Sequence, residues 1–587
     1  MTTHEFRSLI EVLRFRAQVQ KDSLVYTFLR DGETPSDVWS FGELDRRSRV
    51  IAATLQKLNA RGERALLLYP AGLEFIAAFL GCLYAGVVAV PSYPPHPTRP
   101  GRHLSRLQAI GRDATVRLVL ATQAIVAHAS ILVKLVSTLA GARWLATDHL
   151  ADEATDTWQE SVINPETVAF LQYTSGSTGT PRGVVVSHAN LLHNLAYAQA
   201  CGKNDTERVG VSWLPAYHDM GLIEGLLQPL FSGYPAYLMS PAAFLQRPIR
   251  WLQAISRFRG TNSGGPNFAY DLCVRKIPPE ERDSLDLRSW LVAYSGAEPI
   301  RRETLQRFVE AFGRCGFRED TFYPAYGLAE ATLLVSTKPF GEMPVFRAVD
   351  VTGLAHDRAM APSGPDVASV ILPSCGRFSS ATKVIIVNPE THRLCAPGEV
   401  GEVWISGPSV AQGYWQRPAE TEQTFRAYLA ETGDGPFLRT GDLGFIADGE
   451  LFVTGRLKDV IIVRGQKHYP QDIELTVEQS HPAIQPGGVA AFAIDTPSGE
   501  SVGVVVEIDR RRLTGTRGRK ARDLHAMIGV VRETVAEQHE LQLRTVVLIK
   551  PGGLPRTSSG KLQRLACQAH YRAGSLAVLA EWVHQPA

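Results

Sequence analysis

The sequence predicts an α/β fold, with a large N-terminal portion of two doubly wound α/β subdomains and a small β subdomain, followed by a small C-terminal α+β domain. The chain has 587 residues, which is too long for one hydrophobic core. Over roughly the first 330 residues, short β-branched or apolar runs alternate with segments of helical length. After about residue 384 the runs shorten and turns become frequent, which predicts the β subdomain.

The longest apolar stretch, Phe75 to Val90, contains a change from helix to strand. It is shorter than the ~20 residues that cross a bilayer, and Gly81 and Gly86 interrupt it. We therefore expect no integral membrane segment here, but a core helix as far as Tyr84, a break near Gly86, and a buried strand that Pro91 ends. Further N-terminal strands are expected at residues 65–68, 116–121, 168–171 and 184–186.

A loop rich in Ser, Thr and Gly, Tyr173 to Gly183, separates two of these strands. Its hydroxyls and backbone N–H groups could surround a polyphosphate without side-chain bulk. The spacing differs from that of a Walker loop and of a dinucleotide-binding loop, which argues against an ordinary kinase or dehydrogenase. Ser187 is the expected N-cap of a helix that runs to about Ala200, so the loop leads through a strand into a helix. A plain flexible connection remains the alternative.

The C-terminal α+β domain is expected to begin after Arg456. Val460 to Val463 predicts a strand, and Tyr469 to Asp472 opens a helix with an acidic residue in its first turn. The basic tract Arg510 to Arg522 is polar and contains glycine, so an exposed loop is expected there.

Composition narrows the choice of partners and compartment. A formal net charge of +2 with 20% charged residues provides no overall field for nucleic acid, so no nucleic-acid partner is expected. The N-terminus lacks a secretory signal, which predicts a cytoplasmic protein. The seven cysteines are scattered without a C-x-x-C pair, so neither disulfides nor a zinc cluster is expected.

Five further motifs accompany the Ser/Thr/Gly loop in order along the chain. They are Ser295-Gly296-Ala297-Glu298-Pro299, Tyr326-Gly327-Leu328-Ala329-Glu330, Thr440-Gly441-Asp442, Gly455-Arg456-Leu457-Lys458-Asp459 and Pro555-Arg556-Thr557-Ser558-Ser559-Gly560-Lys561. With these motifs the chain resembles the acyl-adenylate-forming superfamily, which includes acyl-CoA synthetases, luciferases and the adenylation domains of peptide synthetases. The resemblance covers nearly the whole chain.

The resemblance implies ATP as a cofactor. Asp442 would accept hydrogen bonds from the ribose hydroxyls, which suits a carboxylate, and Arg456 would contact the ribose or a phosphate. Tyr326 offers a ring to the adenine. The family usually has Thr immediately before Glu330, where this chain has Ala329, and Thr332 is a candidate to replace the missing hydroxyl. The full set expected to bind the nucleotide is Thr174, Ser175, Gly176, Ser177, Thr178, Gly179, Ser295, Gly296, Ala297, Glu298, Tyr326, Gly327, Ala329, Thr332, Asp442 and Arg456.

Three residues are candidates for catalysis. When a carboxylate attacks the α-phosphate of ATP, two anions at ~4 Å repel by about 4 kcal/mol at an effective dielectric of 20. Lys561 is expected to bridge them, as the resemblance implies for the lysine of its motif. Glu330 is expected to hold Mg²⁺ against the phosphates. His218, in an aromatic loop, is expected to orient the acid, although a buried core histidine is the alternative. The run Gly264 to Phe268 is a candidate wall of the acyl tunnel, or a plain turn.

An insertion suggests which branch the chain resembles. Residues 338–374 roughly double the usual family distance between Glu330 and Cys375. Such a segment at this place is similar to the fatty acyl-AMP ligase branch, in which it is thought to restrain the C-terminal domain. A long surface loop is the alternative. The implied organisation is an adenylation domain over residues 1–456, a hinge at 457–459 and a mobile domain over 460–587.

The resemblance therefore implies activation of a fatty acid as its acyl-adenylate, with release of pyrophosphate. The acyl group would then pass to the phosphopantetheine of a holo acyl carrier protein or a polyketide synthase carrier domain. An ordinary long-chain acyl-CoA ligase, an amino acid-activating enzyme and an inactive binding homologue remain the alternatives. Steering of an acidic carrier by the Arg510 to Arg522 tract is a further hypothesis.

Overall fold

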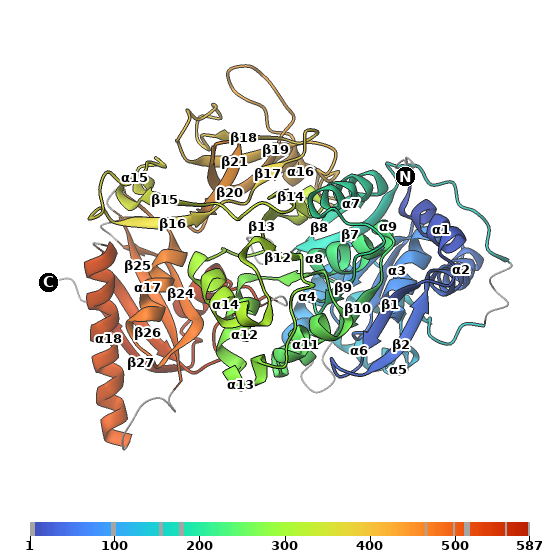
Figure 1. The fold of residues 1–587 in the computed structure, drawn as a ribbon, viewed down its shortest axis with the longest axis horizontal. Coiled ribbons are helices and arrows are strands. Elements are labelled where there is room, and N and C mark those ends of the chain that lie inside the picture. The colour runs from blue at the N-terminus through green and yellow to red at the C-terminus, as the bar shows by residue number, and fades with distance from the viewer. Residues whose placement is uncertain are drawn as a thin grey trace.

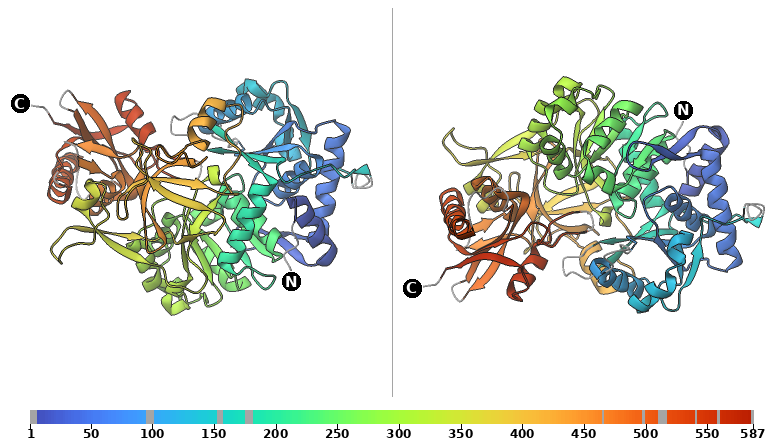
Figure 2. Two further views of the ribbon diagram at one scale, coloured as in Figure 1. Left: turned by 90° about the horizontal axis from the view of Figure 1, so that it is seen from above. Right: turned by 90° about the horizontal axis from the view of Figure 1, so that it is seen from below.

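A computed structural model describes residues 6–94, 101–151, 157–174, 181–463, 466–496, 499–509, 517–539, 541–557 and 560–584. Its N-terminal portion contains two large sheets, and a β subdomain and a C-terminal domain complete the molecule (Figure 1). In the views from above and below, the C-terminal domain lies at the opposite end of the molecule from the first helices (Figure 2). None of the described helices is both long and apolar enough to cross a membrane.

The first large sheet has six strands in the order β6-β5-β3-β4-β7-β8. All neighbours are parallel except β7 and β8, an antiparallel pair whose connection is the Ser/Thr/Gly loop. The strands are β3 (Arg64–Leu68), β4 (Val88–Ser92), β5 (Leu118–Ala121), β6 (Arg143–Ala146), β7 (Val168–Thr174) and β8 (Arg182–Ser187). The associated helices are α2 (Phe41–Lys57), α3 (Glu74–Ala85), α4 (Gly101–Asp113), α5 (Gln123–Val126) and α6 (Ala129–Leu135).

The second large sheet has nine strands in the order β17-β14-β13-β12-β11-β9-β10-β1-β2. The strands are β1 (Leu24–Leu29), β2 (Pro35–Ser40), β9 (Gly210–Ser212), β10 (Ala236–Met239), β11 (Asn262–Gly265), β12 (Val292–Ser295), β13 (Phe322–Gly327), β14 (Leu334–Thr337) and β17 (Arg377–Phe378). The helical segments are α1 (Leu9–Val19), α7 (His188–Gly202), α8 (Asp219–Leu222), a π-helical turn (Ile223–Leu227), α9 (Gln228–Ser232), α10 (Pro241–Gln246), α11 (Ile249–Phe258), α12 (Asn267–Lys276), α13 (Pro279–Arg282) and α14 (Arg302–Phe312).

The largest hydrophobic core lies between these two sheets. It joins strand residues of both sheets, such as Leu67 and Tyr26, to α3, α7 and the π-helical turn. The other face of each sheet also carries helices, with α4 on the first sheet and α11, α12 and α14 on the second. Helices on both faces confirm the doubly wound prediction.

The local signals in the sequence explain several element boundaries. Ser187 and Asn190 form a capping box at the start of α7, as the N-cap prediction requires. Gly86 ends α3 with φ +67°, a left-handed conformation that favours glycine. The expected end of the strand at Pro91 is wrong, because β4 continues to Ser92 and Pro91 pairs with Leu67. Proline has no backbone N–H to donate. Because β4 pairs with β7, its other neighbour, only at Ala89, Pro91 removes no hydrogen bond between these two strands.

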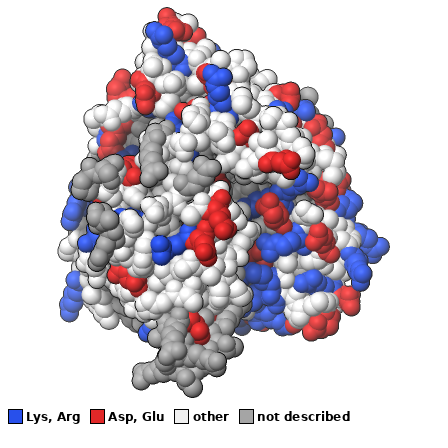
Figure 3. Space-filling model, turned by 90° about the vertical axis from the view of Figure 1, so that its left-hand side faces the viewer, with Lys and Arg blue, Asp and Glu red and all other residues white. Residues whose placement is uncertain are grey.

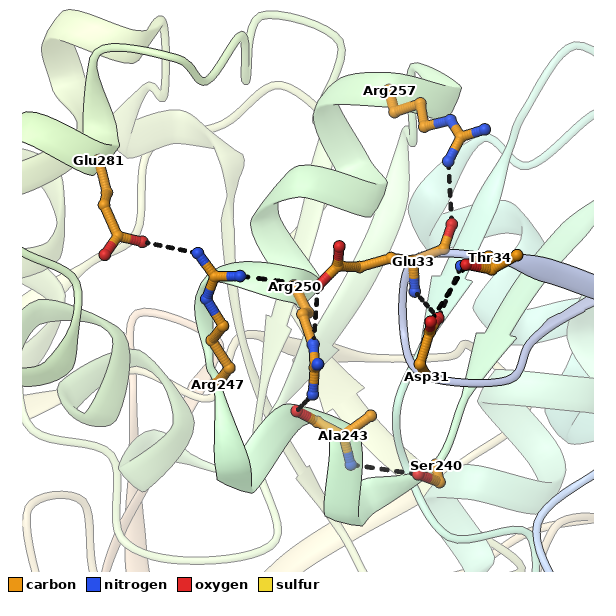
Figure 4. Close-up of polar contacts among 9 residues, drawn as sticks. All are labelled: Asp31, Glu33, Thr34, Ser240, Ala243, Arg247, Arg250, Arg257 and Glu281. Atoms are coloured by element: carbon orange, nitrogen blue, oxygen red, sulfur yellow. Dashed lines mark hydrogen bonds and ion pairs between the residues drawn. The ribbon is translucent and has the colours of Figure 1, made fainter.

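Charged side chains fasten the turn after β1 to the neighbouring helices (Figure 4). The Asp31 carboxylate accepts backbone hydrogen bonds from Glu33 and Thr34 within the turn. Glu33 in turn accepts from Arg250 Nε at 2.9 Å, and its carbonyl accepts from Arg257 at 2.9 Å. Because both arginines belong to α11, the network holds this helix against the turn after β1.

The β subdomain and the insertion follow the second sheet. The subdomain is a four-stranded antiparallel sheet of β18 (Lys383–Val387), β19 (Gly401–Ser406), β20 (Leu438–Ala447) and β21 (Glu450–Arg456), with α16 (Pro418–Phe425). The inserted segment, residues 338–374, contains β15 (Phe346–Asp350), α15 (Val351–Ala355) and β16 (Ser369–Pro373). Since β15 and β16 form their own antiparallel pair, the segment has more structure than a long surface loop.

The C-terminal portion is built on the sheet β24-β25-β26-β27. Its elements are β22 (Ile461–Val463), β23 (Gln466–His468), α17 (Pro470–Ser480), β24 (Ile484–Thr496), β25 (Gly499–Ile508), α18 (Arg517–His539), β26 (Leu543–Ile549), α19 (Arg564–Arg572) and β27 (Val578–Val583). Residues 510–516 of the basic tract lie outside the described residues, and from Arg517 the chain is helical where a loop was expected. The face that carries α18 mixes both charge signs, with Lys and Arg gathered beside a hollow (Figure 3).

Candidate active site

A cavity of about 600 Å³ lies where the second sheet, the β subdomain and the C-terminal domain meet. Its lining draws on all three parts, from Tyr326 on β13 to Arg456 on β21 and Lys561 near the C-terminus. Cationic side chains outnumber acidic ones in this lining. The cations are Arg106, Arg182, Arg439, Arg456, Lys458 and Lys561, and the acids are Asp219, Glu224, Glu330 and Glu402. The arrangement suits a polyanionic ligand.

The residues that flank the Ser/Thr/Gly loop border this cavity. Thr174, at the end of β7, and Arg182, at the start of β8, both line it. The expected contacts of Ser175, Gly176, Ser177, Thr178 and Gly179 fall outside the described residues.

The floor of the cavity is one face of strands β12 and β13. Alternate residues of a strand share a face, and Val292, Tyr294 and Gly296 all line the cavity, as do Tyr323, Ala325 and Gly327 on the parallel neighbour. From Gly296 back to Val292, four residues of strand extend the floor by about 13 Å. The cavity therefore reaches well beyond the strand ends.

Small residues at the strand ends let a ligand and the backbone approach closely. A Cβ at Gly327 would lie 1.9 Å from the Leu333 carbonyl oxygen, so only glycine fits there. Gly296 and Ala297 line the cavity beside it, whereas Ser295 is fully buried in β12. The Glu298 carboxylate points to α12, where it accepts a hydrogen bond of 2.6 Å from the Phe268 N–H. Burial raises the pKa of Glu298.

Asp442 joins the second sheet to the β subdomain. One carboxylate oxygen accepts a hydrogen bond from the Tyr326 hydroxyl at 2.8 Å, and the other accepts from Arg456 Nε at 2.9 Å. The Asp442 charge raises the pKa of Arg456, which lines the cavity. Burial, and then the Asp442 charge, raises the pKa of Tyr326. The three expected nucleotide contacts thus form one connected group.

Glu330 lies in a short helical turn, Ala329–Ala331, and lines the cavity together with Ala329. One of its carboxylate oxygens accepts a hydrogen bond of 2.9 Å from the Tyr414 hydroxyl. Thr332 lies next to this turn but outside the cavity lining, with φ +69°. Its hydroxyl donates to the Ser409 carbonyl at 2.7 Å, so it does not supply the missing hydroxyl at the cavity.

Lys561 enters the cavity from the C-terminal domain. Its backbone N–H donates to the Thr557 hydroxyl at 3.0 Å, and its carbonyl accepts from the Thr557 N–H at 2.8 Å. Burial lowers the pKa of Lys561, an effect that the negative charge of Asp219 opposes. Asp219 forms an ion pair of 2.6 Å with His218 Nδ1. Although burial alone would raise the pKa of Asp219, the charges of His218 and Lys561 lower it to about 2.

A second cavity opens between α10 and the C-terminal domain. Its lining includes Tyr217 and Leu245 of the N-terminal portion, and Leu554 and Thr557 of the C-terminal domain. Tyr217 and Thr557 also line the first cavity, so the two cavities are neighbours. The predicted tunnel-wall run, Gly264 to Phe268, spans the end of β11 and the start of α12, and none of its residues lines either cavity. A Cβ at Gly265 would lie 2.7 Å from the Trp213 ring.

The inserted segment packs against both of its neighbours. Val349 and Leu354 belong to one hydrophobic cluster with Phe445 and Phe452 of the β subdomain and with Tyr469 of the C-terminal domain. Val349 is fully buried and Leu354 is 4% exposed. The segment thus holds the two parts against each other in this structure.

Sequence motifs missed several residues of the cavity. Tyr414 carries no motif, and only the fold brings it to Glu330. Asp219 belongs to the same aromatic loop as His218, but no pattern in the sequence indicates its role. Lys458 of the predicted hinge lines the cavity, and burial lowers its pKa. Glu224 follows in the same chain segment as His218, and no signal in the sequence distinguishes it from a solvated helix residue.

Comparison with known proteins gives consistent matches over the whole chain. Residues 13–415 match the model of the AMP-binding enzyme family, and residues 458–581 match the AMP domain of Disco-interacting protein 2-like proteins. The chain is 48% identical over 582 residues to the medium-chain-fatty-acid–[acyl-carrier-protein] ligase JamA of Moorena producens, covering 98% of this chain and 97% of that protein.

Two further relatives extend the comparison. The long-chain-fatty-acid–AMP ligase FadD32 of Mycolicibacterium smegmatis is 36% identical over 603 residues, covering 95% of this chain and 93% of that protein. The structure of the fatty acyl-adenylate ligase from L. pneumophila, in complex with acyl adenylate and pyrophosphate, aligns with a TM-score of 0.74 at 37% identity. That alignment covers 99% of this chain and 98% of the other.

Proposed function

Because the chain belongs to the AMP-binding enzyme family, and within it to the fatty acyl-AMP ligase branch, we propose that it activates a fatty acid with ATP and passes the acyl group to a carrier protein. The observation that carries this proposal is the meeting of Lys561, Arg456 and Glu330 in one cavity. These residues come from distant parts of the chain, and together they suit a reaction between two anions.

In the first step, a carboxylate oxygen of the acid attacks the α-phosphorus of ATP. The bond between the α-phosphorus and the bridging oxygen breaks, and pyrophosphate leaves with that electron pair. The Lys561 ammonium offsets the repulsion between the two anions where they meet. Asp219, paired with His218, lies near the lysine, and His218 orients the acid, which needs no base because a carboxylate is already ionised.

The nucleotide is held by the residues around the strand ends. Asp442 accepts from the ribose hydroxyls, and Arg456 contacts the ribose or a phosphate. The adenine lies against Gly296, Ala297 and Gly327, beside the Tyr326 ring. Thr174 and the Ser/Thr/Gly loop bind the phosphates. Glu330 fits a magnesium ion, because that ion needs only one or two protein carboxylates and takes its other ligands from phosphates and water. When bound, the ion neutralises phosphate charge.

In the second step, the phosphopantetheine thiol loses its proton to solvent, and the resulting thiolate attacks the acyl carbonyl. The bond from the acyl carbon to the phosphate oxygen then breaks, and AMP leaves with that electron pair. Two observations support a carrier protein, and not CoA, as the acceptor of the acyl group. JamA is named as an acyl-carrier-protein ligase, and residues 338–374 pack against the C-terminal domain. A polyketide synthase carrier domain is included in the proposal. We also propose residues 457–459 as the hinge between an adenylation domain (1–456) and a C-terminal domain (460–587).

Acid-dependent release of pyrophosphate tests the first step. Purified protein with Mg-ATP and dodecanoate is expected to release pyrophosphate and to form acyl-AMP that mass spectrometry identifies. Pyrophosphate release from no acid across several chain lengths would contradict the proposal and would favour an inactive binding homologue.

A further inference from the structure

Beyond the nucleotide end, the cavity contains a carboxyl group that the proposed reaction does not use. Glu224 lies in the π-helical turn Ile223–Leu227, which directly follows α8. Such turns within helices are frequent at functional sites. The Glu224 side chain is surrounded by protein, and its partial exposure is to the cavity that it lines. Among the described residues it has no hydrogen-bond or ion-pair partner.

Glu224 lies near two groups, on α7 and on the cavity floor, that also line the cavity. Its charge raises the pKa values of the Cys201 thiol, on α7, and of the Tyr294 hydroxyl, on the floor, in each case after burial, so all three groups lie near one another. Tyr294 comes two residues before Gly296 in the chain. It therefore lies about 7 Å further than Gly296 from the nucleotide end of the floor. No described residue accepts a hydrogen bond from the Tyr294 hydroxyl.

A plain alkyl chain is a poor occupant for this stretch. The partly exposed Glu224 carboxyl group can form hydrogen bonds with water in the cavity, and an alkyl chain in that place would exclude the water without replacing those bonds. A hydrogen-bond donor on the chain would satisfy it. Burial raises the pKa of Glu224 to about 7, which is the response expected of a carboxyl group that lacks a compensating positive charge.

We infer that Glu224, with Tyr294, forms a polar subsite that selects acids whose chain carries a hydrogen-bond donor, either a hydroxyl or an amino group, several carbons from the carboxylate. This inference rests on the proposed function, because it concerns the acid of that reaction. Specificity of this kind is strong when a site contains a buried polar group that only the correct substrate can pair.

The test compares acids of equal chain length by kcat/KM for pyrophosphate release. Octanoate is measured against octanoates with a hydroxyl at successive carbons, and against the matching amino series. For at least one position, the substituted acid is expected to exceed octanoate by at least tenfold. If octanoate exceeds every substituted acid, the inference is overturned while the proposed function stands. Pyrophosphate release from no acid would overturn both.

Variants show whether Glu224 causes the preference, and whether the donor on the acid is a hydroxyl or an ammonium group. Glu224→Leu is expected to lower the preference at least tenfold and to raise activity on octanoate, and Tyr294→Phe is expected to lower the preference less. Glu224→Gln keeps an acceptor without charge, so it is expected to retain preference for a hydroxyl and to lose preference for an ammonium. Glu478→Gln, at a half-buried carboxyl group outside the cavity, is the control. An unchanged preference in folded Glu224→Leu, or an equal loss in Glu478→Gln, would overturn the inference.

Discussion

Asp357 of the inserted segment and Lys467 of the C-terminal domain form an ion pair, with Oδ2 and Nζ 2.6 Å apart. The pair is partly exposed, and such pairs contribute about 0–1 kcal/mol. The fully buried Val349 contributes more to the same contact, because it packs in a cluster that reaches Tyr469. Apolar packing, with the ion pair as a minor part, therefore holds the inserted segment against the C-terminal domain.

Loosening this contact is expected to increase the formation of acyl-CoA. Val349→Asp places a charge in the hydrophobic cluster and should raise the rate of acyl-CoA formation by roughly tenfold or more, since burying an unpaired charge costs several kcal/mol. Asp357→Asn should change it less than about fivefold. Chromatography of the products formed with CoA measures both. A larger effect from Asp357→Asn than from Val349→Asp would contradict this account.

The charge of Lys561 is expected to be essential for adenylation. Lys561→Ala should lower kcat for pyrophosphate release at least 100-fold, the usual effect of removing a group that stabilises developing charge. Lys550→Ala, at an exposed lysine of the same domain, is the control and should leave the rate unchanged. A fall of less than tenfold in Lys561→Ala, with the fold intact by circular dichroism, would show that another group stabilises the two anions.

The hydrogen bond from Tyr326 to Asp442 is expected to affect the nucleotide more than the acid. Among the described residues, Tyr326→Phe leaves the Asp442 carboxylate with Arg456 as its one hydrogen-bond partner, and a hydrogen bond to a charged group contributes about 1.5–3 kcal/mol. KM for ATP should therefore rise by roughly tenfold while KM for the acid stays within twofold. Tyr237→Phe, at a tyrosine that stacks on Phe258, serves as the control. Equal changes in both KM values would argue against a role for Tyr326 in positioning the ribose.

Stability is expected to fall in mild acid because of His188. Burial lowers the pKa of His188 to about 4, and its Nδ1 accepts the Leu9 N–H at 3.2 Å. The unfolded chain binds this proton at higher pH than the folded chain does. The stabilisation is therefore complete above about pH 6.5 and is lost as the pH falls toward 4, by up to about 3 kcal/mol.

His188→Asn keeps an acceptor for Leu9 and removes the titration, so its unfolding temperature should depend less on pH between 7.5 and 5 than that of the wild type. The exposed His149 gives the control variant, His149→Asn. Scanning calorimetry measures these unfolding temperatures. If they fall equally with pH in the wild type and in His188→Asn, His188 is not the group responsible for the loss of stability in acid.

Much of the fold and of the cavity could be predicted from local sequence. The alternation of strands and helices predicted the doubly wound layers, and two glycines of the nucleotide motifs, Gly327 and Gly455, lie where a Cβ would clash. The motifs of Lys561, Arg456 and Glu330 predicted residues that the fold brings to one cavity. Residues without a motif, such as Tyr414, could not be predicted, because only tertiary structure brings them to the cavity.

The errors also have physical causes. The strand β4 continues through Pro91 because β7 pairs with it only at Ala89, so no hydrogen bond to β7 is needed at the proline. Thr332 does not line the cavity, because its buried hydroxyl donates to the Ser409 carbonyl instead. Glu224 resembled a surface residue in the sequence, since the helical pattern does not reveal which of its faces borders a cavity.

The central claim is that the protein forms an acyl-adenylate and passes it to a carrier protein. The most direct measurement follows labelled dodecanoyl-AMP, formed in place from Mg-ATP, after the addition of either CoA or a holo acyl carrier protein. We predict that the adenylate persists with CoA and is consumed by the carrier, which becomes acylated. Rapid formation of acyl-CoA, with the carrier left unmodified, would contradict this account and identify the protein as an acyl-CoA ligase.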